Sequence, residues 1–465
     1  MADTTVTVAS TGGDYSSIQA ALDAADITSG RWIVEVDETA VFDEALTTGS
    51  ITGTPTSSNH VVLRANADHR HNGTAGTGAR ISVDGAIGNG IYVTSNYMVI
   101  EGLEIELVSP STSDECIRIQ ASNVLLSGLI LHTASATADT SAVYVGNWDA
   151  SFSIDDSIIY GFTRGGIHLQ QFGSSTARTI TANVDHCTIY DCGASGENES
   201  GAINVRSDNA SDVITVNVYN TVGVNTPETE DFVDGAAGGS GTPSGTVVWN
   251  GSHNVREGSL IDLDGTDNIT DWQVASSGTS DTTQSSGSYV VFEDLTLGSE
   301  SFLLLDEAAG NLAANNGTNR QGSEPDARQD FSIDIQGYSR ATTGVDIGAH
   351  SYGAVAPNPA IAMPLLDATP TFFGPDVIND ALVVLPLLDA SPTFFDSTVI
   401  LGVVGPITPI LLDASATFLG MVVEPAPYPV VLPITSFSPT FYPARVTGGV
   451  VPVQSPRSVG LIPHI

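Results

Sequence analysis

One position of a repeated strand pattern carries side chains that could bind a sugar chain. Five segments between residues 90 and 206 open with a small residue and then alternate apolar, polar and apolar side chains. The polar positions are filled, in chain order, by Tyr92, Arg118, Tyr144, His168 and Asn204. Aromatic rings present apolar faces that fit the C–H faces of sugars, and planar polar side chains bind hydroxyl groups.

This pattern predicts a glycan-binding face. Its candidate residues are Tyr92, Arg118, Tyr144, Trp148, His168, Gln170 and Arg206. The alternative is that these side chains only stack across neighbouring strands and stabilise the sheet surface.

Carboxylates near this face are candidates for catalysis, namely Glu197, Glu199, Asp149 and Asp208. A glycosidase needs two carboxyl groups roughly 5–9 Å apart, one of which donates a proton. With 53 Asp and Glu residues in the chain, such a pair is also expected by chance. The pattern therefore favours binding over catalysis and leaves an enzymatic role open.

Alternating carboxylates at Asp262, Asp264 and Asp267 could hold Ca²⁺, the one cofactor that the sequence suggests. The segment lacks the later bidentate Glu of an EF-hand loop, and it also fits an ordinary turn rich in Asp, Asn and Gly. The run from Asp68 to His71 is interpreted as a polar loop, because no further metal ligands are evident.

The spacing of the five segments indicates the framework that must position them. Their starts lie 26, 26, 24 and 36 residues apart, and a second apolar segment recurs within each repeat. Repeats of this length that hold short strands, without a crossover helix between them, are typical of a parallel β-helix. The phasing predicts ten inward-facing residues: Ile91, Val93, Ile117, Ile119, Val143, Val145, Ile167, Leu169, Ile203 and Val205.

The N-terminal residues predict a cap for the first coil. Ser16 and Ser17 can begin a short helix, which would cover the open end of the solenoid. The apolar face of this helix is predicted to hold Ile18, Ala21, Leu22 and Ala25. Further strands are predicted at 5–8, 31–36, 60–65 and 79–84.

Two segments resemble right-handed parallel β-helix repeat proteins of the pectate-lyase-like class. GGDYSSIQAALDAA (12–25) is similar to their entry segment, and DIQGYSRATTGVDIGAHSYG (334–353) is similar to the stretch that closes their last coil. The resemblance implies an all-β, right-handed parallel β-helix over residues 1–356. It implies no particular activity, because the fold hosts many functions. The catalytic motifs of polygalacturonases, pectate lyases and pectin esterases are absent from the sequence.

Residues 357–465 carry four copies of a short apolar unit. The copies are PLLDATPTFF (364–373), PLLDASPTFF (386–395), ILLDASATFL (410–419) and LPITSFSPTF (432–441), spaced 22 to 24 residues apart. They resemble repeats of tailed-phage structural proteins. A lone unit of this size cannot bury its apolar face, so it must pack on its neighbours or on another chain. We predict a β-rich array that assembles through Phe372, Phe394, Phe418 and Phe441.

The charge balance narrows the class of partner. The chain has a net charge of -39, and all 14 of its basic residues are Arg. Such a surface repels phosphate backbones, so nucleic acid is excluded as a partner. No apolar stretch predicts a membrane helix, and no signal peptide is expected. The absence of Lys fits either a protein made for high salt or a bias in genomic base composition.

These features predict a structural appendage of a tailed virus: a tail spike, a fibre or a capsid-surface protein. We expect a homotrimer in the virion or outside the cell that contacts other virion proteins and binds a host-surface glycan. One alternative is a polysaccharide depolymerase, either a lyase or a glycoside hydrolase. The other is a cell-surface adhesin of a halophile.

Overall fold

The computed structural model describes most of residues 2–351 and, beyond them, the backbone of short strands between 371 and 446. The gaps before 351 are 85–87, 111–113, 134–138, 172–175, 194–200, 208, 225–229, 236–244, 257–258, 262–267, 271–272, 275–289, 291, 296–298, 300–302, 306–310, 312, 341 and 344. The chain divides into two compact units, Met1–Ala354 and Val355–Ile465.

The first unit is built from three parallel sheets, named here in the order in which the chain crosses them. Sheet 1 has ten strands: β1 Thr4–Val8, β2 Trp32–Val36, β5 Val61–Ala65, β8 Val99–Glu101, β11 Val124–Ser127, β14 Ala150–Asp155, β17 Thr179–Asp185, β20 Val213–Tyr219, β23 Thr246–Ser252 and β26 Asn268–Thr270.

Sheet 2 has nine strands: β3 Val41–Asp43, β6 Arg80–Val83, β9 Glu104–Leu107, β12 Ile130–Thr133, β15 Ile158–Tyr160, β18 Thr188–Tyr190, β21 Val222–Val224, β24 Val255–Arg256 and β27 Gln273–Val274. Sheet 3 has eight strands: β4 Leu46–Thr47, β7 Ile91–Val93, β10 Glu115–Ile119, β13 Ser141–Gly146, β16 Gly165–Gln171, β19 Gly201–Ser207, β22 Glu230–Gly235 and β25 Ser259–Ile261.

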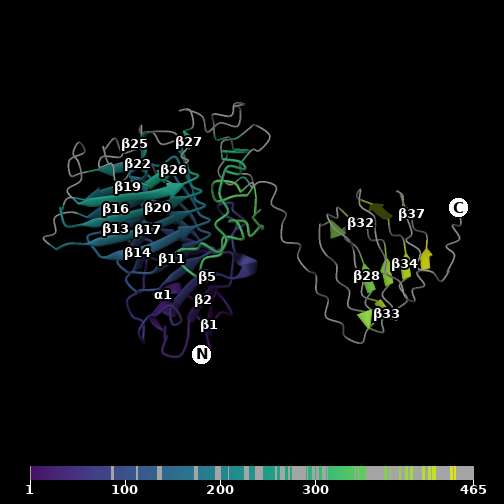
Figure 1. Ribbon diagram of the computed structural model, residues 1–465. Helices are drawn as coiled ribbons and strands as arrows, with labels where there is room; N and C mark the ends of the chain where they lie inside the picture. The colour runs from purple at the N-terminus through teal and green to yellow at the C-terminus, as the bar shows by residue number, and fades with distance from the viewer. Residues whose placement is uncertain are drawn as a thin grey trace. The chain divides into compact units, whose positions relative to one another are not determined.

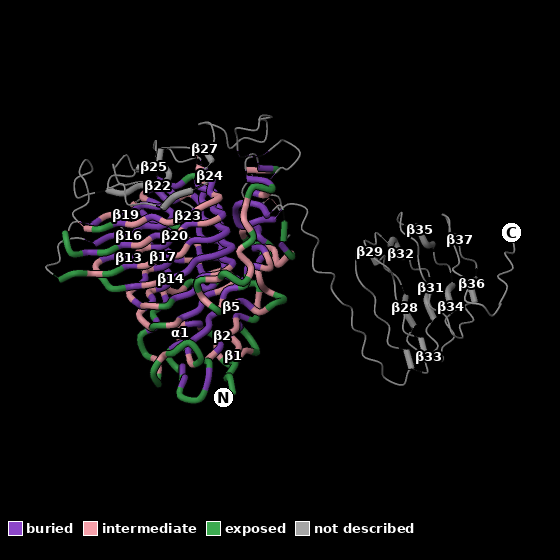
Figure 2. The backbone as a smooth tube through the Cα atoms, in the orientation of Figure 1, coloured by how far each residue is buried: buried purple, intermediate pink, exposed green. Residues whose placement is uncertain are grey.

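From β2 onward the coils contribute strands to the three sheets in turn, and successive coils stack in parallel register (Figure 1). The predicted parallel β-helix is confirmed. All ten predicted inward residues are fully buried, including Ile117, Val143 and Ile167 at 0% exposure. They belong to one continuous apolar core that runs through the stacked coils (Figure 2). Burying aliphatic side chains of this size contributes roughly 1.5–3 kcal/mol each.

The N-terminal cap is also confirmed. Helix α1 spans Ile18–Asp23, and the side chain of its N-cap Ser17 accepts a hydrogen bond from the backbone N–H of Ala20. Ile18, Ala21, Leu22 and Ala25 are all buried in the core. The other described helix is the one-turn 3₁₀ helix η1, Ala67–His69. No helix in the described part of the chain is long and apolar enough to cross a membrane.

The corner between sheets 1 and 2 repeats one backbone conformation from coil to coil. The corner residue has a positive φ in six successive coils, at Gly102, Gly128, Asp156, His186, Asn220 and His253. At the second of these positions glycine also leaves room for a neighbouring side chain. A Cβ atom at Gly128 would lie 2.2 Å from Nη2 of Arg70, which packs against this turn.

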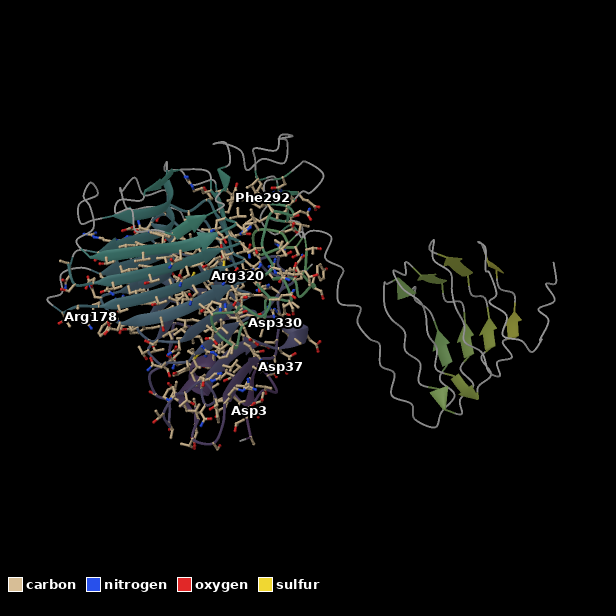
Figure 3. The ribbon with its side chains drawn as sticks, viewed as in Figure 1. Asp3, Asp37, Arg178, Phe292, Arg320 and Asp330 are labelled. Carbon is tan, nitrogen blue, oxygen red and sulfur yellow. The ribbon has the colours of Figure 1, made fainter. Side chains whose placement is uncertain are left out.

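Residues 313–351, named here the return segment, run back along this corner (Figure 1, green). Nε of Arg320 lies 2.7 Å from a carboxylate oxygen of Asp185, and Nη2 of Arg340 lies 2.5 Å from one of Asp156. Arg328 donates to the carbonyl oxygens of Tyr97 and Asn123, several coils closer to the N-terminus. The expectation that 334–353 closes the last coil is therefore wrong, because the segment binds the side of the helix. Figure 3 labels Arg320 on this side and Arg178 at the other end of sheet 1.

The second unit repeats the solenoid principle with shorter strands. One parallel sheet holds β28 Thr371–Phe373, β31 Thr393–Phe395, β34 Thr417–Leu419 and β36 Thr440–Tyr442, and a second holds β29 Val377–Ile378, β32 Thr398–Leu401, β35 Val422–Pro425 and β37 Arg445–Val446. Strand β30 Leu387–Leu388 pairs with β33 Leu411–Asp413. The register aligns Phe372, Phe394, Phe418 and Phe441, one from each sequence repeat.

Candidate functional site

Sheet 3 stacks the predicted polar positions into one outward column. Arg118 pairs in register with Tyr92 on one side and Tyr144 on the other, and His168 pairs with Tyr144 and Asn204. Gln170 and Arg206 pair with each other two residues along the same strands. The alternation of side chains across a strand sends this column outward, because the neighbouring Ile and Val residues face the core. Whether the column binds a glycan stays a prediction.

The part of the column nearest the N-terminus, named here the open half (Tyr92, Arg118 and Tyr144), is partly exposed. The guanidinium carbon of Arg118 lies 5.7 Å from the ring centroid of Tyr92 and 5.3 Å from that of Tyr144. A guanidinium flanked by two aromatic faces is held in place by cation–π attraction. The open half therefore presents two rings and one oriented cation to solvent.

The next part, named here the closed half (His168, Gln170 and Asn204), is buried. These residues are 0%, 2% and 0% exposed. Tyr144 separates the two halves, with its ring edge-on to His168 at 5.4 Å between centroids. Its hydroxyl donates to Oε1 of Gln170 at 3.0 Å. A Cβ atom at Gly146 would lie 2.1 Å from that hydroxyl, so the glycine leaves room for the ring over the strand.

His168 and Asn204 are buried without satisfying their polar atoms. Neither ring nitrogen of His168, and neither amide atom of Asn204, has a hydrogen-bond partner within the described part of the chain. A buried polar group left without a partner costs about 1–3 kcal/mol. Burial holds the pKa of His168 well below its usual value, and the fields of Arg164 and Arg206 add to this effect. His168 is therefore neutral at pH 7, with one ring nitrogen able to donate a hydrogen bond and the other able to accept one.

Glu115 is a carboxylate of this face that the sequence analysis missed. It begins β10, pairs in register with Ser141, and is 5% exposed. Burial raises its pKa to about 7, although Arg118 opposes the shift. A signal was present in the sequence, since Glu115 directly precedes the small residue Cys116 that opens the repeated segment. Its burial depends on the surrounding coils, which strand periodicity does not report.

Two predicted residues lie at the corner between sheets 3 and 1. Trp148 is 42% exposed, and its carbonyl oxygen accepts a hydrogen bond from Nε2 of Gln171. Asp149 accepts a hydrogen bond from the backbone N–H of Thr179 at 2.8 Å. Trp148 is therefore available beside the column, whereas the Asp149 carboxylate is engaged in a turn at the start of β17.

Several predicted residues fall outside what the structure describes. These are the catalytic candidates Glu197, Glu199 and Asp208, the calcium candidates Asp262, Asp264 and Asp267, and the side chains of the four assembly phenylalanines. Within the described residues, no group of three or more His, Cys, Asp or Glu side chains could hold a metal ion. Cys116, Cys187 and Cys192 are free and buried.

The loop from Asp68 to His71 has a structural role. Nδ1 of His69 lies 3.0 Å from the hydroxyl of Thr39. His71 is buried, with Nε2 lying 2.8 Å from the carbonyl oxygen of Gly128 and Nδ1 accepting from the N–H of Gly73. Burial lowers the pKa of His71 to about 4. This loop therefore ties its own coil to the corner two coils further along the chain.

No protein-family model and no curated protein sequence matches the chain. Among solved structures it is similar to the pectin methylesterase from Aspergillus niger in deglycosylated form. The two are 15% identical over 60% of this chain and 87% of the enzyme, with a TM-score of 0.37. It is also similar to pectate lyase Pel9A, at 13% identity over 75% of this chain and 96% of that one, with a TM-score of 0.34. These similarities assign no activity to this chain.

Proposed function

We propose that this protein is a glycan-binding appendage that holds a sugar chain along the outward face of sheet 3. The observation that carries the proposal is the open half, where Arg118 is oriented between the rings of Tyr92 and Tyr144. Trp148 extends this surface at the corner of the sheet, where it is 42% exposed. Exposed large hydrophobic side chains are few in the described part of the chain, so an exposed Trp beside an aromatic column favours a ligand contact.

We further propose that the protein is part of a tailed virus particle and that its second unit joins it to neighbouring subunits. Two observations support this part. The four repeats share one parallel register that aligns their phenylalanines. The net charge of -39 over the full chain disfavours nucleic acid as a partner. The expected partners are further copies of the chain and other virion proteins.

A polysaccharide depolymerase is the second candidate, and Glu115 is the observation that favours it. A carboxyl group with a pKa of about 7 retains its proton near neutral pH, as a general acid requires. The charged groups that act on it include Arg118, Asp114 and Asp139. Shortening of a bound polysaccharide that is lost in Glu115→Gln would favour this candidate.

Affinity electrophoresis tests the binding function directly. The full-length protein is run in gels that contain galactomannan, dextran or polygalacturonate, and we expect retardation in at least one of them. Tyr92→Ala and Trp148→Ala should each weaken retardation about tenfold, equivalent to a stacking contribution of about 1.4 kcal/mol. Val41→Ala is the matched control, because Val41 is 52% exposed but lies on sheet 2. Retardation that the two aromatic substitutions leave unchanged would contradict the proposal.

Assembly is tested separately by sedimentation. Removing residues 357–465 should leave a folded β-helix, because the first unit has its own continuous core. We expect the shortened protein to sediment as a monomer and the full chain as a trimer. A shortened protein that still forms the native oligomer would remove the assembly role of the repeats.

A further inference from the structure

His168 and Asn204 lie next to each other in one column, yet they do not pair. The two residues are directly in register on β16 and β19. On sheet 1, asparagines at the same strand spacing do reach one another, since Nδ2 of Asn217 donates to Oδ1 of Asn183 at 2.8 Å. A hydrogen bond between neighbours in such a column is therefore within reach. His168 and Asn204 do not make it, although both are 0% exposed.

The unpaired atoms define what could satisfy them. Neutral His168 offers one N–H donor and one acceptor nitrogen, and Asn204 offers an NH₂ donor and a carbonyl acceptor. A carboxylate only accepts, so it would leave the acceptor nitrogen of His168 and Oδ1 of Asn204 unpaired. An ammonium or guanidinium group only donates, so it would leave the N–H groups unpaired. A hydroxyl group both donates and accepts.

We propose that His168 and Asn204 form a specificity subsite that takes two neighbouring hydroxyl groups of a neutral sugar. One hydroxyl donates to the ring nitrogen of His168 and accepts from the NH₂ group of Asn204. The other donates to Oδ1 of Asn204, because the two nitrogens of an imidazole point in divergent directions and a vicinal diol reaches only one of them. This inference rests on the proposed glycan binding and deepens it, because it names a diol as the recognised group and neutral glycans as the ligand class.

Tyr144 controls entry to this subsite from the open half. It stands between Arg118 and His168 in the column, and its hydroxyl is bonded to Gln170. A sugar stacked on the open half reaches His168 when the Tyr144 ring swings away from Gln170. The subsite is therefore filled after the sugar has docked on the rings.

The test compares a double variant with a matched amide on sheet 1. His168→Leu with Asn204→Leu removes all four unpaired atoms, whereas Asn217→Leu removes an amide that is paired on both sides. The probes are galactomannan, galactomannan whose vicinal diols have been cleaved by periodate and reduced with borohydride, and polygalacturonate. Binding is measured by affinity electrophoresis of the full-length protein, and stability by thermal unfolding.

We expect the unsubstituted protein to bind galactomannan at least tenfold more strongly than the periodate-treated polymer. The double variant should lose this preference while its Tm rises by about 2–4 °C, because unpaired buried groups have been removed. Asn217→Leu should keep the preference and lower the Tm.

Four results would overturn the inference. A double variant with a lower Tm would show that the two side chains are satisfied by bound water and serve the fold. A double variant that keeps the diol preference would place recognition elsewhere, while the proposed function stands. If the protein binds polygalacturonate and not galactomannan, the diol subsite is rejected and the proposed glycan binding stands. If it binds none of the polymers, both the subsite and the proposed glycan binding are rejected.

Discussion

The outward faces of sheets 1 and 3 both carry amide side chains in register, but only sheet 1 pairs them with one another. On sheet 1, Asn250 donates to Asn217, Asn217 to Asn183, and Asn183 to the hydroxyl of Ser153. On sheet 3, Asn204 lies beside His168 with no bond between them. Identical amides in successive coils hydrogen-bond to one another along the coil axis. In a mixed column of rings and amides, some polar atoms are left without hydrogen-bond partners. The first column serves the fold, and the second is the one in which we propose a ligand site.

The column of sheet 1 also shows how one register position changes character along the molecule. Towards the N-terminus the same column holds Ile33, Val62, Val99 and Leu125, which form a small buried apolar cluster. It then passes to Ser153 and the three asparagines.

The largest expected effect on stability comes from the hydrogen-bonded asparagine column of sheet 1, named here the amide ladder (Asn183, Asn217 and Asn250). Asn217→Leu breaks two amide hydrogen bonds and leaves the oxygen of Asn183 and the NH₂ group of Asn250 without this partner. We expect a loss of about 2–3 kcal/mol in the free energy of unfolding. Urea denaturation measures it. An unchanged urea midpoint would mean that the amide ladder does not add to the free energy of unfolding. The difference between the two sheets would then not affect stability.

The second expected effect is the pH dependence of Glu115. Its pKa in the folded state is raised to about 7 from an ordinary value of 4.5, so its contribution to stability is present below pH 4.5 and is lost as the pH rises through 7. Glu115→Gln should therefore increase the free energy of unfolding at pH 8, by on the order of 2 kcal/mol, and leave it almost unchanged at pH 4. Denaturation of both proteins at the two pH values checks this. A gain of equal size at both would exclude a titration effect.

The stacking of the coils could be predicted from the sequence, but the partners of several polar side chains could not. Alternation with a period of two placed Ile117 inward and Arg118 outward, because that pattern is local. Arg320 and Arg340 find Asp185 and Asp156 across 135 and 184 residues of chain, and no local pattern encodes such a contact. The amide ladder lies between these cases. Its asparagines at 183, 217 and 250 are 34 and 33 residues apart, so their spacing is visible in the sequence, whereas their hydrogen bonds to one another are not.

A third expected effect concerns the residue that separates the open and closed halves. Gly146→Ala places a Cβ atom where the Tyr144 hydroxyl now lies, so the ring must move and its bond to Gln170 is lost. We expect a destabilisation of about 1 kcal/mol. His168 should also become reactive towards diethyl pyrocarbonate, measured by peptide mapping. Protection of His168 in this variant would show that Tyr144 does not control access to the closed half.

The smallest expected effect on stability concerns Arg118. It tests whether the outward face of sheet 3, unlike the amide ladder of sheet 1, binds a ligand. The guanidinium is flanked by two rings at 5.7 and 5.3 Å, and Lys at this position keeps the charge but loses the planar group. Because a partly exposed cation–π contact contributes about 0.5–1 kcal/mol, we expect Arg118→Lys to lower the free energy of unfolding by about 0.5 kcal/mol. Arg118→Gln, which is planar but uncharged, is the matched variant. If the face binds a neutral sugar, Arg118→Gln should retain more affinity for galactomannan than Arg118→Lys, because planarity orients the hydrogen bonds. The opposite order would mean that charge governs binding, and an acidic glycan would then replace the neutral one as the expected ligand.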